Sequence, residues 1–227
     1  LYSIDVTTAA SKYWGKQPFT AGPTYLGAVV IYFAILGLIL TSARNRWWII
    51  VVSLFALLLA WGSNLMGFYE FVFDYLPAYD TFRTVSMALV VVQWSAPLLC
   101  AIALWELWHT KLSFRKLAIK ASIALGIVVM MIAFMALIAD YGRGDIEAMF
   151  GHTWWSEKIA DSICEARRAA YMTDAWRALL YVALCAGAVI LYGYMRERDM
   201  QPIKRYMPYI LVTVVGALAV SDLVGVD

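Results

Sequence analysis

The sequence predicts an all-α fold, a polytopic transmembrane helical bundle of about six spans, and three observations point to it. Of the 227 residues, 63% are hydrophobic and only 15% are charged, which is more apolar than an ordinary soluble domain. The apolar residues gather in segments of about 20, the length that crosses the hydrocarbon core of a bilayer. Basic residues cluster in every second connection between these segments. We therefore expect residues 1–227 to form a single transmembrane region whose first partner is the lipid bilayer.

Six apolar segments meet the length that a membrane-spanning helix needs. Tryptophan favours the boundary between lipid and water, and it marks the ends of two segments. Trp47 and Trp48 open the second segment, and Trp105 and Trp108 close the third. The predicted spans are residues 22–42, 47–64, 84–108, 118–139, 178–195 and 207–226.

The connections between the predicted spans alternate in charge. Three short turns concentrate lysine and arginine, at residues 44–46, 109–120 and 196–205. The other connections collect most of the acidic residues, at 1–21, 65–83 and 140–177. Lys and Arg in short loops remain on the cytoplasmic side of a membrane. We therefore expect the three basic turns to face the cytoplasm and the three acidic connections to face outward.

The outer connection 140–177 contains a helical pattern of its own. Apolar residues recur there at helical spacing, namely Trp155, Ile159, Ile163, Ala166 and Ala170. Charged residues occupy the other faces of the same stretch. A helix with one apolar and one charged face suits the boundary between lipid and water. The pattern predicts an amphipathic helix over residues 154–170 that lies along the outer interface.

Charge and motif content exclude several classes of function. A net charge of +2 is too small for a nucleic-acid-binding protein, so no nucleic-acid partner is expected. The chain contains no Walker loop, dinucleotide glycine fingerprint, zinc-binding histidine pair or serine nucleophile elbow. Cys100, Cys164 and Cys185 lack metal-ligand spacing and are expected to be free thiols. We expect no cofactor, unless carboxylates hold a divalent cation.

Three charged residues of the outer connection 65–83 are candidates for a binding site. Asp74 and Asp80 can act as a paired acid and base or hold a divalent ion through oxygen ligands. The alternative is an ordinary solvated acidic loop. Arg83 ends this aromatic-rich connection where the third span begins, and its guanidinium can grip a phosphate at the membrane surface. The alternative for Arg83 is a side chain that merely extends toward water.

Polar residues inside the predicted spans need partners, because an unpaired polar group is costly in lipid. Gln93, Ser95 and Pro97 interrupt the third span, and interhelical hydrogen bonds with a proline kink are the expected reason. Asp222 lies near the outer end of the sixth span, where a structural role and a role in binding are equally open.

Two stretches of the chain carry a resemblance to a known family, and a third supports it. The first is YWGKQPFTAGPTYLG at residues 13–27, and the second begins with WGSNLMG at 61–67 and ends with FRTVS at 82–86. The third is the arginine-rich run 167–177, together with the later triplet 221–223. With these motifs the chain resembles the YfhO-like family of bacterial membrane proteins, in its Bacteroidetes form.

The resemblance implies a function. Members of this family are long polytopic proteins placed among glycosyltransferases of the GT-C type, which take sugar from a polyprenyl-phosphate carrier on the outer face of the bacterial inner membrane. It implies that this chain is a fragment, that the remainder of the polypeptide is a partner, and that the catalytic acid precedes Leu1. Under this reading Arg83, Asp74, Asp80 and Asp222 contribute to substrate binding.

Two readings from other classes remain open. In a transporter or flippase for a lipid-linked glycan, Arg83, Gln93 and Asp222 would line a route through the bundle. In a structural subunit of an envelope complex, no residue need be catalytic. The three readings differ in what a substitution at Arg83 changes: transfer of sugar, movement of the carrier, or assembly.

Overall fold

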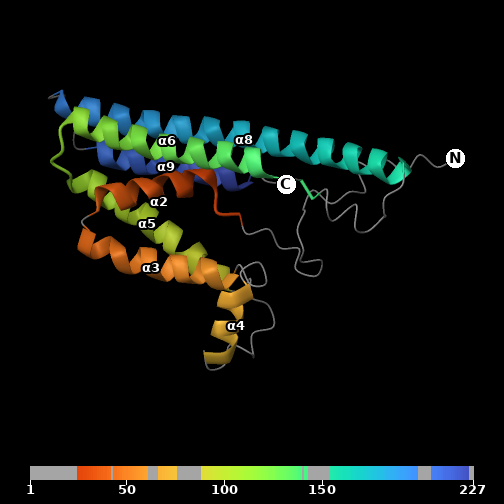
Figure 1. Cartoon of the computed structure of the whole chain (residues 1–227). Coiled ribbons are helices and arrows are strands. Elements are labelled where there is room, and N and C mark those ends of the chain that lie inside the picture. Colours follow the sequence, from red (N-terminus) through yellow and green to blue (C-terminus); the bar gives the residue numbers. More distant parts are fainter. Residues whose placement is uncertain are drawn as a thin grey trace.

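The computed structural model describes residues 25–41, 43–60, 66–75, 88–139, 141–142, 154–198 and 206–224. Within these ranges every regular element is an α-helix (Figure 1). The helices are α2 (Ala28–Leu40), α3 (Ala43–Ala60), α4 (Met66–Tyr75), α5 (Leu89–His109), α6 (Phe114–Ile138), α8 (Trp154–Glu197) and α9 (Met207–Val224). The predicted all-α class is confirmed for this part of the chain.

Four of these helices, α5, α6, α8 and α9, are long and apolar enough to cross a membrane. The chain is therefore a multi-pass helical membrane protein. Helix α2 has 13 residues and the apolar part of α3 is Arg46–Ala60, so both fall below that length. A helix rises about 1.5 Å per residue, so α2 is about 20 Å long against a hydrocarbon core of about 30 Å.

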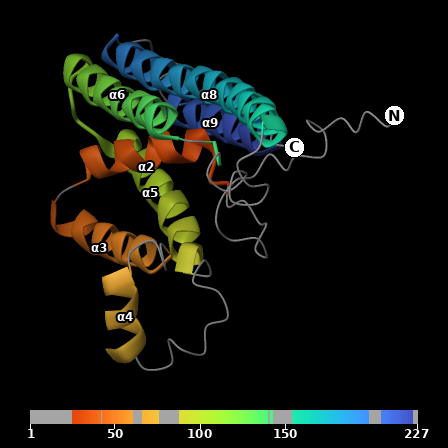
Figure 2. The same cartoon turned by 45° about the vertical axis from the view of Figure 1, so that its right-hand side comes forward.

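The described helices form a layered bundle with α2 near its centre (Figures 1 and 2). Helices α6, α8 and α9 lie side by side, and α2 packs against all three and against α5. Helix α3 packs on α5, and α4 lies at the edge of the bundle. The central position of α2 is visible in Tyr32, Phe33 and Leu36, whose side chains are fully buried. Helix α2 is therefore packed among four neighbouring helices.

Small residues allow two of these helix pairs to approach closely. A Cβ added to Gly37 of α2 would lie 2.5 Å from the carbonyl oxygen of Leu99 on α5. A Cβ added to Gly193 of α8 would lie 2.9 Å from the side chain of Leu117 on α6. Glycine at such contacts is the usual way in which membrane helices bring their backbones together. The α2–α5 contact therefore depends on the missing side chain of Gly37.

Polar side chains inside the bundle find partners across helices. The hydroxyl of Tyr32 donates to the carbonyl of Ala121 at 3.4 Å. The hydroxyls of Ser53 on α3 and Ser95 on α5 are 2.8 Å apart, which confirms the interhelical bond expected for Ser95. Gln93 differs from the expectation, because its side chain is exposed and lines a cleft described below. Interhelical bonding thus explains Ser95 but not Gln93.

Basic side chains hold the turns together at one end of the bundle, which we call the basic end. Each donates to a backbone carbonyl at or just beyond the end of a helix, where cations offset the partial negative charge of the helix dipole. The bonds run from Arg46 to Leu38 O at 2.6 Å, from Lys120 to Ile39 O at 3.0 Å and from Arg196 to Thr110 O at 2.7 Å. The three predicted basic turns therefore meet at the same end.

The largest difference from the sequence prediction concerns the connection 140–177. Residues 154–170 are helical as expected, but they continue into the fifth span as the single 44-residue helix α8. The helix is straight in Figure 1 and its first half extends beyond α6 and α9. At about 1.5 Å per residue it is about 66 Å long, twice the thickness of the hydrocarbon core. The prediction of a separate helix lying along the interface is therefore wrong.

Smaller corrections apply to the ends of the other elements. The connection 65–83 contains helix α4, so it is not a loop throughout. Helix α3 begins at Ala43, before the predicted start at residue 47, and α5 begins at Leu89, after the predicted start at residue 84. The observed helix ends differ from the predicted ones because hydropathy marks only the apolar part of a helix. The helix itself continues into polar residues or stops short of them.

Candidate functional site

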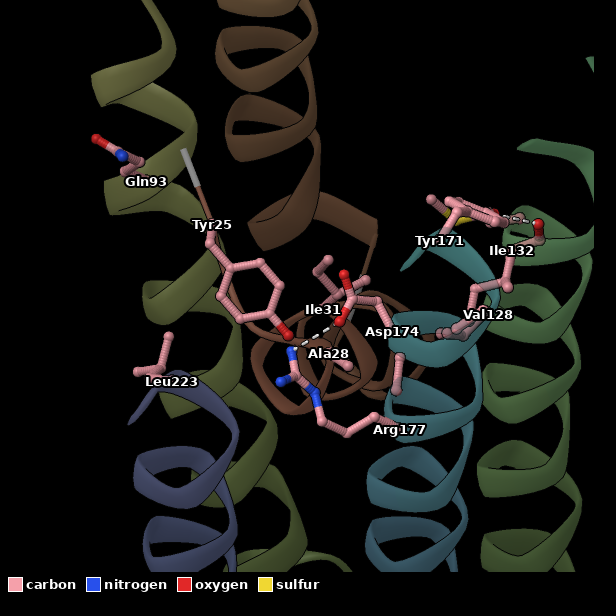
Figure 3. A pocket seen from close by; sticks show the side chains of 13 residues that line it. Tyr25, Ala28, Ile31, Gln93, Val128, Ile132, Tyr171, Asp174, Arg177 and Leu223 are labelled. Carbon is pink, nitrogen blue, oxygen red and sulfur yellow. Dashed lines mark hydrogen bonds and ion pairs between the residues drawn. The ribbon is translucent and has the colours of Figure 1, made fainter. Parts of the chain in front are cut away.

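A cleft of about 740 Å³ opens at the end of the bundle opposite the basic end (Figure 3). It lies among the start of α2, the first turns of α5, the second half of α6, the middle of α8 and the end of α9. Its lining residues are Tyr25, Ala28, Ile31, Gln93, Val128, Met131, Ile132, Tyr171, Asp174, Ala175, Arg177, Ala178 and Leu223. Five elements that are far apart in the sequence therefore build one site.

One side of the cleft is polar and carries a cation. The guanidinium of Arg177 lies beside the hydroxyl of Tyr25 in Figure 3. On its other side Arg177 faces Asp174, with 3.6 Å between Nη2 and Oδ1. The side chain of Arg177 is 26% exposed and that of Asp174 is 68% exposed. The cleft thus presents a half-buried guanidinium with a solvated carboxylate next to it.

Asp222 lies directly behind this polar side. It is 0% exposed, and both of its carboxylate oxygens accept hydrogen bonds. The hydroxyl of Tyr25 donates to Oδ1 at 2.8 Å, and the backbone N–H of Val29 donates to Oδ2 at 3.2 Å. Val29 is in the first turn of α2, where backbone N–H groups have no partner within the helix. Asp222 on α9 therefore caps α2 across 193 residues of sequence.

A glycine makes this contact between α9 and α2 possible. Gly27 has φ +81°, in the left-handed region that favours glycine, and a Cβ there would lie 3.1 Å from Asp222 Oδ2. Both the backbone conformation and the approach of the carboxylate therefore select glycine directly before α2.

The other side of the cleft is apolar. Ile31, Val128 and Ile132 form much of this wall, with Met131 beside them. The hydroxyl of Tyr171 donates to the carbonyl of Ile132 at 2.7 Å, which joins α8 to α6 at the cleft wall. A largely apolar cleft with a few polar groups is typical of small-molecule binding sites.

The structure locates two of the four residues that the sequence selects for substrate binding. Asp222 adjoins the cleft through Tyr25 but has no exposed surface there. Asp74 is exposed on α4 and does not line the cleft. Arg83 and Asp80 lie outside the described residues, and their roles stay predictions. The transport reading gains no support from Asp222, since a fully buried side chain does not line a route.

Sequence reasoning missed Tyr25 and Arg177 on the polar side of the cleft, and Tyr171 on its opposite wall. A usable signal existed for Arg177. Arg83 drew attention because an arginine stands directly before an apolar span, and Arg177 stands directly before the span predicted at 178–195. Tyr25 lies within the motif at residues 13–27, but no local pattern marks it as a site residue, because its partners are distant in the sequence.

Metal binding finds no support in the part of the chain that the structure describes. No group of three His, Cys, Asp or Glu side chains lies close enough there to hold an ion. Cys100, Cys164 and Cys185 are free thiols, as expected. The predicted cation pair Asp74 and Asp80 is not tested, because Asp80 lies outside the described ranges.

No known protein family, curated protein or solved structure matches this chain. The cleft and the residues that build it are therefore the basis for assigning a function.

Proposed function

We propose that this chain is the membrane-embedded part of a glycosyltransferase that uses a polyprenyl-phosphate-linked sugar on the outer face of the bacterial inner membrane. Its task is to bind the lipid phosphate and the acceptor, and the catalytic acid is supplied from outside the chain. The observation that carries this proposal is the position of Arg177, a half-buried cation at the rim of an otherwise largely apolar cleft.

The polar rim suits a lipid phosphate. A guanidinium has five N–H donors, so it can bond to more than one acceptor at once. Arginine binds phosphate through two parallel hydrogen bonds, and partial burial strengthens such charge-assisted bonds. Asp174 is solvated and its contact with Arg177 is long, so a phosphate competes with it at small cost. The exposed carboxylate can then accept hydrogen bonds from sugar hydroxyls.

The apolar wall suits the prenyl chain of the same ligand. A volume of about 740 Å³ is within the range of about 300–1,000 Å³ typical of small-molecule sites, which is enough for a phosphate and the first prenyl units. Ile31, Val128 and Ile132 supply branched side chains to this wall. A ligand held by both sides would lie with its head at the membrane surface and its tail in lipid.

The outward orientation of the cleft follows from a six-span topology, in which α2 and α3 cross the membrane together with the four longer helices. A cysteine that replaces Asn45, in a variant without Cys100, Cys164 and Cys185, is then expected to escape an impermeant maleimide in intact cells and to react after permeabilisation. The matched control is Thr173→Cys, exposed on the outer part of α8, which is expected to react in intact cells. Labelling of residue 45 in intact cells would refute the topology.

Lipid-phosphate binding tests the proposed function directly. The purified protein in lipid nanodiscs is expected to bind farnesyl phosphate at least about tenfold more tightly than farnesol, because a charge-assisted bond contributes about 1.5 kcal/mol or more. Equal affinity for the two ligands would show that the cleft has no phosphate site and would overturn the proposal. Inorganic phosphate that binds as tightly as farnesyl phosphate would also overturn it, since the apolar wall would then contribute nothing.

A further inference from the structure

We propose that Tyr25 and Asp222 are positioning residues for Arg177, and that together they fix the direction in which its guanidinium faces the lipid phosphate. This inference rests on the proposed function, since it concerns the same cleft. Asp222 would then act on a ligand that it does not touch.

The Tyr25 hydroxyl lies between Asp222 and Arg177. Its proton is directed at Asp222 Oδ1, 2.8 Å away. The phenolic oxygen still has lone pairs, and the guanidinium of Arg177 lies beside it (Figure 3). A hydroxyl can donate one bond and accept others. Tyr25 therefore accepts from Arg177 while it donates to Asp222, and the three side chains form one hydrogen-bonded chain.

Asp222 is the fixed end of this series of hydrogen-bonded side chains. Asp222 is 0% exposed, and its second oxygen accepts the Val29 N–H at 3.2 Å. Gly27 keeps the backbone close enough for a Cβ position to lie 3.1 Å from the same oxygen. The carboxylate is therefore held by the backbone of α2 and by its own helix α9. The acceptor of the Tyr25 hydroxyl is therefore fixed in position, and so is Tyr25 as the neighbour of Arg177.

Restricting Arg177 in this way raises its affinity for a phosphate. A free arginine side chain has many rotamers, and ordering it on binding weakens the affinity. The contact with Tyr25 restricts Arg177 before a ligand arrives. A guanidinium held in this way meets a phosphate in a defined geometry, which two-point binding requires. Tyr25 and Asp222 should therefore affect the affinity for the phosphate group and leave the affinity for the prenyl group unchanged.

Tyr25→Phe tests the inference, with Tyr171→Phe as its matched control. Both substitutions remove a hydroxyl from the cleft wall, but Tyr171 donates to the carbonyl of Ile132 and not to Asp222. The readout is the ratio of the dissociation constants for farnesol and farnesyl phosphate in nanodiscs. We expect Tyr25→Phe to lower this ratio about five- to tenfold with unchanged affinity for farnesol, and Tyr171→Phe to preserve the ratio. Asp222→Asn is expected to lower it about threefold, since the amide keeps one acceptor oxygen.

The outcomes separate the two proposals. A wild-type protein without preference for the phosphate contradicts the proposed function. If the preference for farnesyl phosphate over farnesol is lost in Arg177→Gln but intact in Tyr25→Phe, the positioning role of Tyr25 and Asp222 is contradicted and the proposed function is not. Equal weakening of farnesol and farnesyl phosphate by Tyr25→Phe also overturns the positioning role, because a purely structural role would give that result. If Asp222→Asn does not fold, the comparison of Tyr25→Phe with Tyr171→Phe decides the question.

Discussion

Replacement of Arg177 by Gln is expected to weaken the binding of farnesyl phosphate by about one to two orders of magnitude. The variant keeps a polar side chain, but it is shorter and loses the charge and the paired donors that match a phosphate. Affinity for farnesol should not change, because the apolar wall is formed by other residues. Binding to the purified protein in nanodiscs measures both affinities.

Two further variants make this prediction sharper. Arg168→Gln removes a cation from the same part of α8, but Arg168 is exposed and does not line the cleft, so affinity should be unchanged. Asp174→Asn removes the carboxylate that competes for Arg177, so affinity for farnesyl phosphate should rise about two- to threefold. If Arg177→Gln binds farnesyl phosphate as the wild type does, Arg177 is a surface partner of Asp174 and the cleft is not a phosphate site.

The fold class could be predicted from the sequence because lipid imposes a simple rule. Long apolar segments predict membrane-spanning helices, of which four are long enough in the described residues. Alternating basic turns predict the end at which the turns meet, and Arg46, Lys120 and Arg196 confirm this second point. Helix α8 was divided because its two halves differ in polarity. A continuous helix was nevertheless indicated, since no glycine or proline lies between residues 154 and 186.

The candidate site was predictable only in part. Asp222 attracts attention as an acid in an apolar segment, but its partners Tyr25 and Val29 are 197 and 193 residues away. No local pattern encodes such a pair, because it arises when the end of α9 meets the start of α2. Arg177 and Arg83 share one signal, an arginine directly before an apolar span. That signal cannot choose between them, because it does not show which other helices meet at that point.

Replacement of Gly37 by Ala is expected to give the largest loss of stability among single-methyl additions to the described glycines. The new Cβ would lie 2.5 Å from the carbonyl oxygen of Leu99, a distance that real contacts do not show. The obstacle is backbone on a neighbouring helix, so relief requires α2 and α5 to separate. Overpacking of this kind costs about 1–3 kcal/mol. At about 2–4 °C per kcal/mol, the melting temperature of the purified protein should fall by about 2–12 °C.

Gly126→Ala is the matched control and is expected to cause no loss of stability. Gly126 lies within α6, and a Cβ there meets nothing within 4 Å. Alanine is favoured over glycine in a helix by about 1 kcal/mol, so the melting temperature should stay the same or rise. Both variants add the same methyl group to a helix, so the difference between them isolates the α2–α5 contact. A rise in melting temperature for Gly37→Ala equal to that for Gly126→Ala would show that α2 and α5 do not meet at Gly37, and the position of α2 at the centre of the bundle would have to be revised.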